Sequence, residues 1–90
     1  MKSFHQMKPF KKDVKLLNKR GYNLSLLVQA LSIIGDGLTL PAIYWDHQLQ
    51  GNWKGWRECH IQPDWLLIYQ TTDDEVRLAR TGTHADLFGT

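Results

Sequence analysis

Residues 56–81, WRECHIQPDWLLIYQTTDDEVRLART, contain three extended segments separated by two turns. The turns are the Gln-Pro-Asp of residues 62–64 and the Thr-Asp-Asp of residues 72–74, which are typical turn formers. Residues 65–69 are apolar without alternation, a pattern typical of a central strand covered on both faces. The stretch therefore predicts three consecutive strands, each paired with the next by a short connection.

The first of these strands, residues 56–61, alternates its side chains between two faces of the predicted sheet. One face carries Trp56, Glu58 and His60, and the other carries Arg57, Cys59 and Ile61. Residues 75–81 supply the third strand, after the second turn.

Two amphipathic helices are predicted before the strands. Pro9 suits the first position of a helix, because its missing N–H costs nothing there. Apolar side chains recur at helical spacing in two sets, one for each predicted helix. The first helix is expected to end near Gly21 and the second near residues 35–37. The two sets are Phe10, Val14 and Leu17, then Leu24, Leu27, Val28 and Leu31.

The remaining segments complete one α+β domain spanning residues 1–90. Residues 3–7 allow a short strand, and residues 42–55 are expected to be extended chain and loop. The expected order is β-α-α-β-β-β with a short C-terminal tail. Helices grouped before strands favour a helical hairpin packed on one face of a small antiparallel sheet.

Composition agrees with a folded protein of this size. Hydrophobic residues make up 42% and charged residues 22% of the 90 positions. Cys59 is the only cysteine, so an internal disulfide and a cysteine-based zinc site are excluded. No apolar stretch approaches the roughly 20 residues that cross a bilayer, and none resembles a signal peptide. A cytoplasmic protein with no membrane partner is expected.

Positive charge is concentrated at the N-terminal end, although the net charge is only +2. Residues 1–20 contain seven lysines and arginines against one carboxylate, Asp13. Such a segment indicates a polyanionic or acidic protein partner. A solvated lysine-rich helix explains the same pattern equally well.

Several blocks of the chain together resemble one known family. They are DHQLQGNWKGWRECHIQPDWLLIYQ (46–70), RTGTHADLFG (80–89), KKDVKLLNKR (11–20) and LPAIY (40–44). These blocks are similar, in order and in spacing, to the YafQ-like branch of the RelE superfamily of bacterial toxins. The resemblance spans nearly the whole chain and is weakest over residues 1–7.

The resemblance implies both a fold and an activity. Family members have a helical hairpin on a sheet, and they cut mRNA in the ribosomal A site, which arrests growth. The products carry a 2′,3′-cyclic phosphate and a free 5′-hydroxyl, and the reaction uses no metal and no bound cofactor. The implied partners are the ribosome, mRNA and a cognate antitoxin that binds the operator DNA of both genes.

The chemistry of such a cut explains why histidines are needed. RNA carries its own nucleophile, the ribose 2′-OH, so the protein must help this group lose a proton. It must also stabilise an anionic phosphorane and protonate the departing 5′-oxygen. Imidazole suits both proton transfers, because its pKa lies near neutral pH.

Matched residue by residue, the functional positions of the family fall on His47, His60, Asp64, His84 and Phe88. The resemblance implies that His84 is the general acid or stabilises the phosphorane, and that His47 or His60 is the base. Asp64 would orient an imidazole and hold its charged form, unless it only caps a turn. Phe88 would stack on a base, unless it only plugs the sheet edge.

Cationic side chains are the predicted RNA contacts. Arg57 and Arg80 are expected to clamp phosphates, with help from Lys54. The lysines of the first helix, above all Lys11, Lys12 and Lys15, would contact ribosomal RNA if they are more than a solvated face. Trp53, Trp56 and Trp65 are expected in the core or at its rim rather than as base platforms.

Three other interpretations compete with this one. A metal site of His47, His60, His84 and Asp64 is disfavoured, because Pro63 prevents a helical ligand pair and no HExxH or CxxC spacing exists. A ParE-like toxin would share the fold but poison DNA gyrase, which needs no paired proton-transfer groups. A non-catalytic module that binds DNA or an antitoxin would need only the basic helix.

Overall fold

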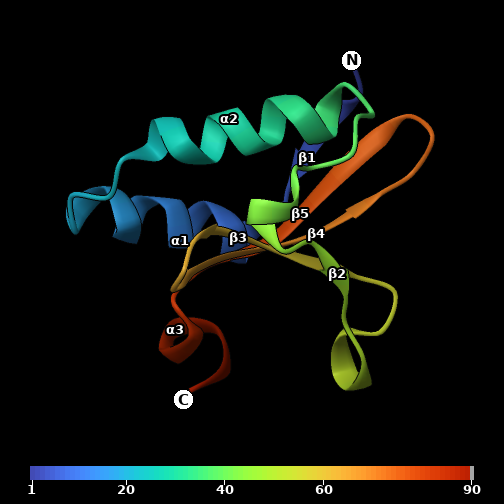
Figure 1. Ribbon diagram of the computed structural model, residues 1–90. Coiled ribbons are helices and arrows are strands. Elements are labelled where there is room, and N and C mark those ends of the chain that lie inside the picture. Colours follow the sequence, from blue (N-terminus) through green and yellow to red (C-terminus); the bar gives the residue numbers. More distant parts are fainter. Residues whose placement is uncertain (90) are drawn as a thin grey trace.

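A five-stranded sheet with two long helices on one side forms the body of the protein (Figure 1). The structure, a computed structural model, describes residues 1–89. The predicted α+β class is confirmed. In chain order the elements are β1 (Ser3–Gln6), α1 (Lys8–Lys19), α2 (Leu24–Gly35), η1 (Ala42–Tyr44), β2 (His47–Gln48), η2 (Gly51–Trp53), β3 (Arg57–Gln62), β4 (Trp65–Thr71), β5 (Glu75–Gly82) and α3 (His84–Phe88).

The sheet is antiparallel from β2 to β5, as predicted, and β1 makes it mixed because it pairs in parallel. The strand order is β1-β5-β4-β3-β2, and the pairs from β2 to β5 are antiparallel. β1 instead pairs in parallel with β5, from Ser3 opposite Glu75 to Gln6 opposite Leu78. Parallel strands require a crossover connection, and here the helical hairpin and three further strands lie between the two.

Short elements occupy segments that were expected to be irregular. Residues 42–55 contain the 3-10 turns η1 and η2 and the two-residue strand β2, which pairs with β3 at the sheet edge. The C-terminal tail is the helix α3, because Thr83 and Asp86 form a capping box that satisfies the first backbone N–H groups.

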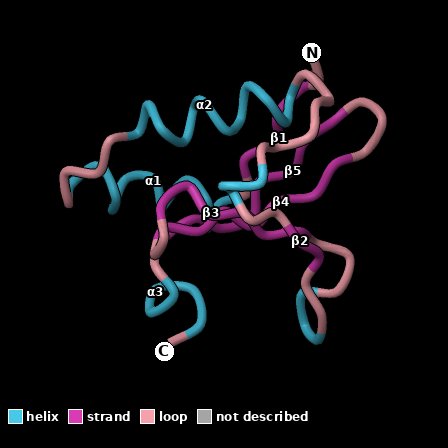
Figure 2. Tube along the Cα trace, in the orientation of Figure 1, coloured by secondary structure: helices cyan, strands magenta, loops and turns pink. Residues whose placement is uncertain are grey.

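The core lies between the helix pair and one face of the sheet (Figure 2). Its buried members from the helices are Phe10, Leu17, Leu27, Ala30 and Ile34, and those from the three central strands include Cys59, Trp65, Leu67, Tyr69, Val76 and Leu78. Each large apolar side chain buried in this way contributes about 1.5–3 kcal/mol. Val28, which was predicted to share the apolar stripe of α2, is 58% exposed because the buried face follows Leu27, Ala30 and Ile34.

Strand β3 divides its side chains between the core and the opposite face of the sheet. Cys59 is completely buried in the core, and burial raises the pKa of its thiol to about 12. Successive side chains of a strand point to opposite faces, so Glu58 and His60 lie on the face away from the helices. The thiol is protonated and inert at neutral pH.

Three arginine–aspartate pairs connect segments that are distant in sequence. In each pair two guanidinium nitrogens donate to the two carboxylate oxygens, which is the stronger, bidentate geometry, and Nε of Arg57 donates to both oxygens of Asp46. The pairs are Asp13–Arg80, joining α1 to β5, Arg20–Asp86, joining the end of α1 to α3, and Asp46–Arg57, joining the residue before β2 to β3. Through them α3 and β2 are held at fixed places on the sheet.

A buried hydrogen bond joins β4 to β5 near the end of the sheet that carries α3. The indole N–H of Trp65 donates to Oγ1 of Thr81 at 2.9 Å, and this hydroxyl donates to the carbonyl of Leu66 at 2.7 Å. Both Trp65 and Thr81 are 1% exposed. The hydroxyl therefore satisfies two polar atoms that water cannot reach.

Thr81→Val should lower the free energy of unfolding by about 1–3 kcal/mol, because it keeps the shape but leaves the Trp65 indole N–H and the Leu66 carbonyl unpaired. Thr81→Ser keeps the hydroxyl and should cost less, below about 1.5 kcal/mol for the lost methyl group. Urea unfolding of the three proteins measures both values. A valine variant as stable as the serine variant would contradict this account.

Asp86 should make stability depend on pH in the acid range. The hydrogen bonds from Arg20 and then from the Thr83 backbone lower the pKa of Asp86 to about 2, below the ordinary value of roughly 3.9. A carboxyl with a lowered pKa in the folded state stabilises above its unfolded pKa, and this stability is lost as the pH falls toward its folded pKa. Asp86→Asn should therefore lose less stability than the parent between about pH 4 and pH 2. Asp73→Asn, an exposed turn variant, is the control in the same urea series.

Candidate active site

Three histidines from separate elements lie together on the side of the sheet away from α1 and α2. His47 belongs to β2, His60 to β3 and His84 to α3. The ring centroids of His47 and His60 are 6.4 Å apart, and those of His60 and His84 are 5.9 Å apart. The structure thus brings together all three of the histidines that were predicted to act in proton transfer. His5, in β1, lies at the opposite edge of the sheet.

Each of these imidazoles is anchored through its Nδ1 atom. The partners are oxygen atoms that can only accept, so each Nδ1 carries a hydrogen and donates it. The bonds are His47 to the Trp45 carbonyl at 2.8 Å, His60 to the Pro63 carbonyl at 3.2 Å, and His84 to Oδ1 of Asp64 at 2.5 Å. In every ring, Nε2 remains as the nitrogen that can exchange a proton with a substrate.

Glu58 lies between two of the rings and was not predicted as a site residue. Its Oε1 atom is 3.6 Å from Nε2 of His47 and 3.5 Å from Nε2 of His60. The residue is only 6% exposed, so its carboxylate stabilises a positive charge on either ring more strongly than an exposed group would. The alternation of β3 already placed Glu58 on the same face as His60, and that was the available signal.

Asp64 orients His84 rather than His60. It lies in the turn between β3 and β4, and its Oδ1 also accepts the backbone N–H of His84 at 3.0 Å. The backbone N–H and then the imidazole of His84 lower the pKa of Asp64, so the carboxylate is ionised at neutral pH. The two bonds fix both the ring and the first residue of α3, which is more than the turn cap that the sequence also allowed.

Phe88 is presented by the same short helix as His84. The two residues are four apart in α3, so their side chains lie on the same helix face. Phe88 is 41% exposed. A side chain exposed to this degree is accessible to a partner, and its stacking on a base stays a prediction.

The predicted phosphate clamps Arg57 and Arg80 have carboxylate partners. Nε and Nη2 of Arg57 donate to Asp46, and the same atoms of Arg80 donate to Asp13. These bonds raise the pKa of both guanidinium groups. The structure therefore gives each arginine a fold-supporting contact, and their contact with RNA stays a prediction.

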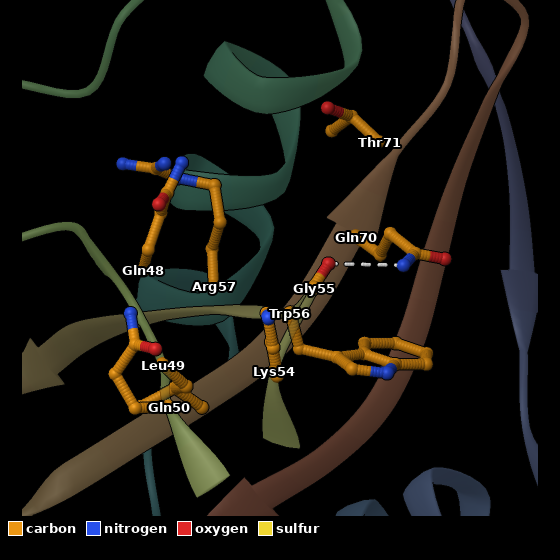
Figure 3. Close-up of a pocket in the computed structure, with 9 residues that line it drawn as sticks. All are labelled: Gln48, Leu49, Gln50, Lys54, Gly55, Trp56, Arg57, Gln70 and Thr71. Atoms are coloured by element: carbon orange, nitrogen blue, oxygen red, sulfur yellow. Dashed lines mark hydrogen bonds between the residues drawn. The ribbon is translucent and has the colours of Figure 1, made fainter.

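Lys54 and Arg57 line a hollow of about 340 Å³ at the end of the sheet where β3 begins (Figure 3). Gln70 also lines this hollow, and its side-chain amide donates a hydrogen bond to the Gly55 carbonyl at 3.0 Å (Figure 3). Arg57 and His60 are three residues apart in an extended strand, about 10 Å along it. None of the three imidazoles lines this hollow, so Lys54 and the imidazole cluster occupy separate places, and the contact of Lys54 with RNA stays a prediction. Lys11, Lys12 and Lys15 are exposed on α1.

The tryptophans fall into two groups. Trp65 is in the core, while Trp53 and Trp56 pack edge to face with ring centroids 5.9 Å apart, as expected for core or rim residues. Trp45, which was not singled out, is 70% exposed. Its ring centroid lies 5.2 Å from that of His60 and 6.4 Å from that of His47.

Within residues 1–89, no group of three or more histidines, cysteines or carboxylates is arranged to hold a metal ion. Over the same residues, every helix is too short or too polar to span a membrane.

Comparison with known proteins agrees with this architecture. The family described as "Bacterial toxin of type II toxin-antitoxin system, YafQ" matches residues 2–89. The mRNA interferase toxin YafQ of Escherichia coli strain K12 is 52% identical over 81 residues, which cover 89% of this chain and 88% of that protein.

Two solved structures are also similar. One is the E. coli DinJ–YafQ toxin–antitoxin complex, with 46% identity, 98% of each chain covered and a TM-score of 0.90. The other is a metal-bound toxin from Helicobacter pylori, with 39% identity, a TM-score of 0.91, and 98% of this chain and 100% of that one covered. A family match over almost every residue, joined to relatives of this identity and coverage, shows that the chain belongs to the YafQ family of bacterial type II toxin–antitoxin toxins.

Proposed function

We propose that this protein is an mRNA interferase, an endoribonuclease that cuts mRNA in the ribosomal A site during translation. The observation that carries the proposal is the cluster of His47, His60 and His84, each anchored through Nδ1 so that Nε2 is the nitrogen that exchanges a proton, with Nε2 of the first two beside Glu58. The similarity to the E. coli mRNA interferase toxin supports the same assignment. The products would be a 2′,3′-cyclic phosphate and a free 5′-hydroxyl.

His84 is the proposed general acid. Its Nδ1 hydrogen is held by the ionised Asp64, so the ring presents Nε2 in one fixed orientation. A proton on that nitrogen can pass to the departing 5′-oxygen, and the neighbouring carboxylate stabilises the imidazolium that carries it until then.

His47 or His60 is the proposed base at the 2′-OH. When Nε2 of either ring takes the hydroxyl proton, the imidazole becomes a cation beside Oε1 of Glu58. The buried carboxylate then stabilises the newly formed charge. The three rings are close enough to lie on both sides of one ribose–phosphate link, as an in-line displacement requires.

Substrate binding completes the proposal. Phe88 would stack on a base, since single-stranded RNA is commonly held on aromatic faces. Lys54 and the exposed lysines of α1, Lys11, Lys12 and Lys15, are the proposed contacts with RNA phosphates. Arg57 and Arg80 add less attraction, because each is paired with an aspartate.

A cognate antitoxin is the proposed protein partner. The similar E. coli protein was solved in a complex with DinJ, which is a toxin–antitoxin complex. The antitoxin of this chain would in turn bind the operator DNA of both genes. A basic helix α1 agrees with an acidic partner of this kind.

Induction of the free protein in bacteria, followed by primer extension on mRNA, tests the proposed function. The wild type should arrest translation and leave breaks in phase with codons, and His84→Ala should reduce cutting on the order of 10²-fold or more while folding normally. His5→Ala, which removes an exposed histidine at the far edge of the sheet, is the matched control and should cut as the wild type does.

The other outcomes of this experiment identify the competing functions. DNA-damage signalling without mRNA breaks would indicate a gyrase poison, and an absence of toxicity would indicate a binding module. Wild-type cutting by His84→Ala would remove this residue from the mechanism.

Cleavage should persist in excess EDTA when the ribosomes keep their magnesium. The proposed steps use only imidazoles and carboxylates. Within residues 1–89, His47, His60 and Glu58 are not arranged as a group that could hold a metal ion, although both Nε2 atoms face the carboxylate. The metal-bound relative makes this a real test. A toxin that loses its activity after EDTA treatment and regains it with added zinc or copper would overturn the metal-independent mechanism.

A further inference from the structure

An apolar hollow of about 490 Å³ opens directly beside the imidazole cluster. It lies between the start of α2, the η1 turn and the connection from β3 to β4. The apolar side chains that line it include Leu26, Ile43, Ile61 and Pro63, and the rings of Trp45 and His60 line it as well. Among the described residues that line this hollow there is no lysine, arginine, aspartate or glutamate.

Trp45 holds a backbone conformation that is costly for a bulky residue. Its φ of 49° and ψ of 46° are left-handed, and it is the one residue other than glycine with a positive φ within residues 1–89. A conformation of this kind persists where the surrounding structure enforces it, and such residues concentrate at functional sites. Here it sets the Trp45 carbonyl against Nδ1 of His47 and leaves the indole 70% exposed.

The chemistry of the hollow favours a nucleobase over a phosphate. A phosphate needs cations or aligned N–H donors, whereas a base offers flat, weakly charged faces that stack on aromatic rings. The Trp45 and His60 rings are tilted by 35° with centroids 5.2 Å apart, so the indole that lines the hollow lies next to an imidazole of the cluster.

We infer that Trp45 and this hollow bind the base of the nucleotide on the 5′ side of the cleaved bond. This inference rests on the proposed function, in which His47 or His60 acts on the 2′-OH of that same nucleotide. Trp45 lies beside both of these rings, while Phe88 follows the proposed acid His84 and faces the nucleotide that leaves. Two aromatic side chains then hold the two bases that flank the scissile phosphate.

Binding can be measured without cleavage in the His84→Ala background. The probes are a single-stranded RNA hexamer of adenosines and an abasic ribose–phosphate hexamer of the same length. The indole N–H signal of Trp45, assigned in NMR spectra through Trp45→Phe, should shift with the first probe and not with the second. The indole of Trp65, buried and bonded to Thr81, should not move and serves as the internal control.

Equal shifts with both hexamers would show a response to the backbone alone and would overturn the inference. A Trp45 signal that ignores RNA but moves when an antitoxin is added would also overturn it, because the hollow would then be a protein-docking surface.

Primer extension tests the same residue in the reaction. Trp45→Ala should cut on the order of 10-fold less and lose preference for the base on the 5′ side, whereas Trp45→Phe should keep most of both. Val28→Ala, which removes exposed apolar surface on α2, is the control and should match the wild type. Unchanged rate and preference in Trp45→Ala would overturn the inference. A wild type that cuts no mRNA would contradict the proposed function, and the hexamer experiment would still decide whether Trp45 binds a base.

Trp45→Gly separates the ring from its backbone. Glycine adopts a positive φ without a steric cost, so Trp45→Gly should melt at a higher temperature than Trp45→Ala while losing cleavage to the same extent. A lower melting temperature for Trp45→Gly than for Trp45→Ala would contradict the claim that the left-handed backbone of Trp45 is strained.

Discussion

Strand β3 can bury Cys59 under the helices only by directing Glu58 and His60 to the other face of the sheet. The register against β4 holds this division in place, with Cys59 opposite Leu67 and Glu58 opposite Ile68. A slip of one residue would exchange the two faces, placing a carboxylate and an imidazole in the core. The register of β3 against β4 therefore determines both the packing of the core and the assembly of the imidazole cluster. The core contacts that stabilise this register also hold the site residues in position.

Periodicity in the sequence was enough to predict the parts of the fold that depend on near neighbours. Helical spacing predicted α1 and α2, alternation predicted the two faces of β3, and an apolar run predicted β4. The parallel docking of β1 and the two-residue strand β2 were not predictable in this way, because each depends on a partner strand and not on its own pattern. The resemblance to a toxin family supplied the histidines, but the partner of Asp64, twenty residues away on α3, emerged only from the structure.

The arginines show why residue type alone is a weak guide to a nucleic-acid contact. Arg57 and Arg80 were natural choices for binding phosphate, yet Asp46 and Asp13 occupy the planar, two-bond geometry that a phosphate would use. Asp13, the one carboxylate among the first twenty residues, is held by Arg80 from β5. The positive surface of α1 therefore consists of lysines, whose flexible ammonium groups attract a polyanion without a fixed geometry.

The pairing of β1 with β5 links Ser3 to Glu75 and governs the order in which a nascent chain can fold. The helical hairpin can form early from local contacts, whereas the first strand has no partner until β5 has emerged from the exit tunnel. Contacts between residues so distant in sequence slow folding, because the entropy of closing a long loop is lost before the contacts can stabilise the structure. His84 follows β5, so elongation of the polypeptide itself sets the moment at which the third imidazole joins the other two.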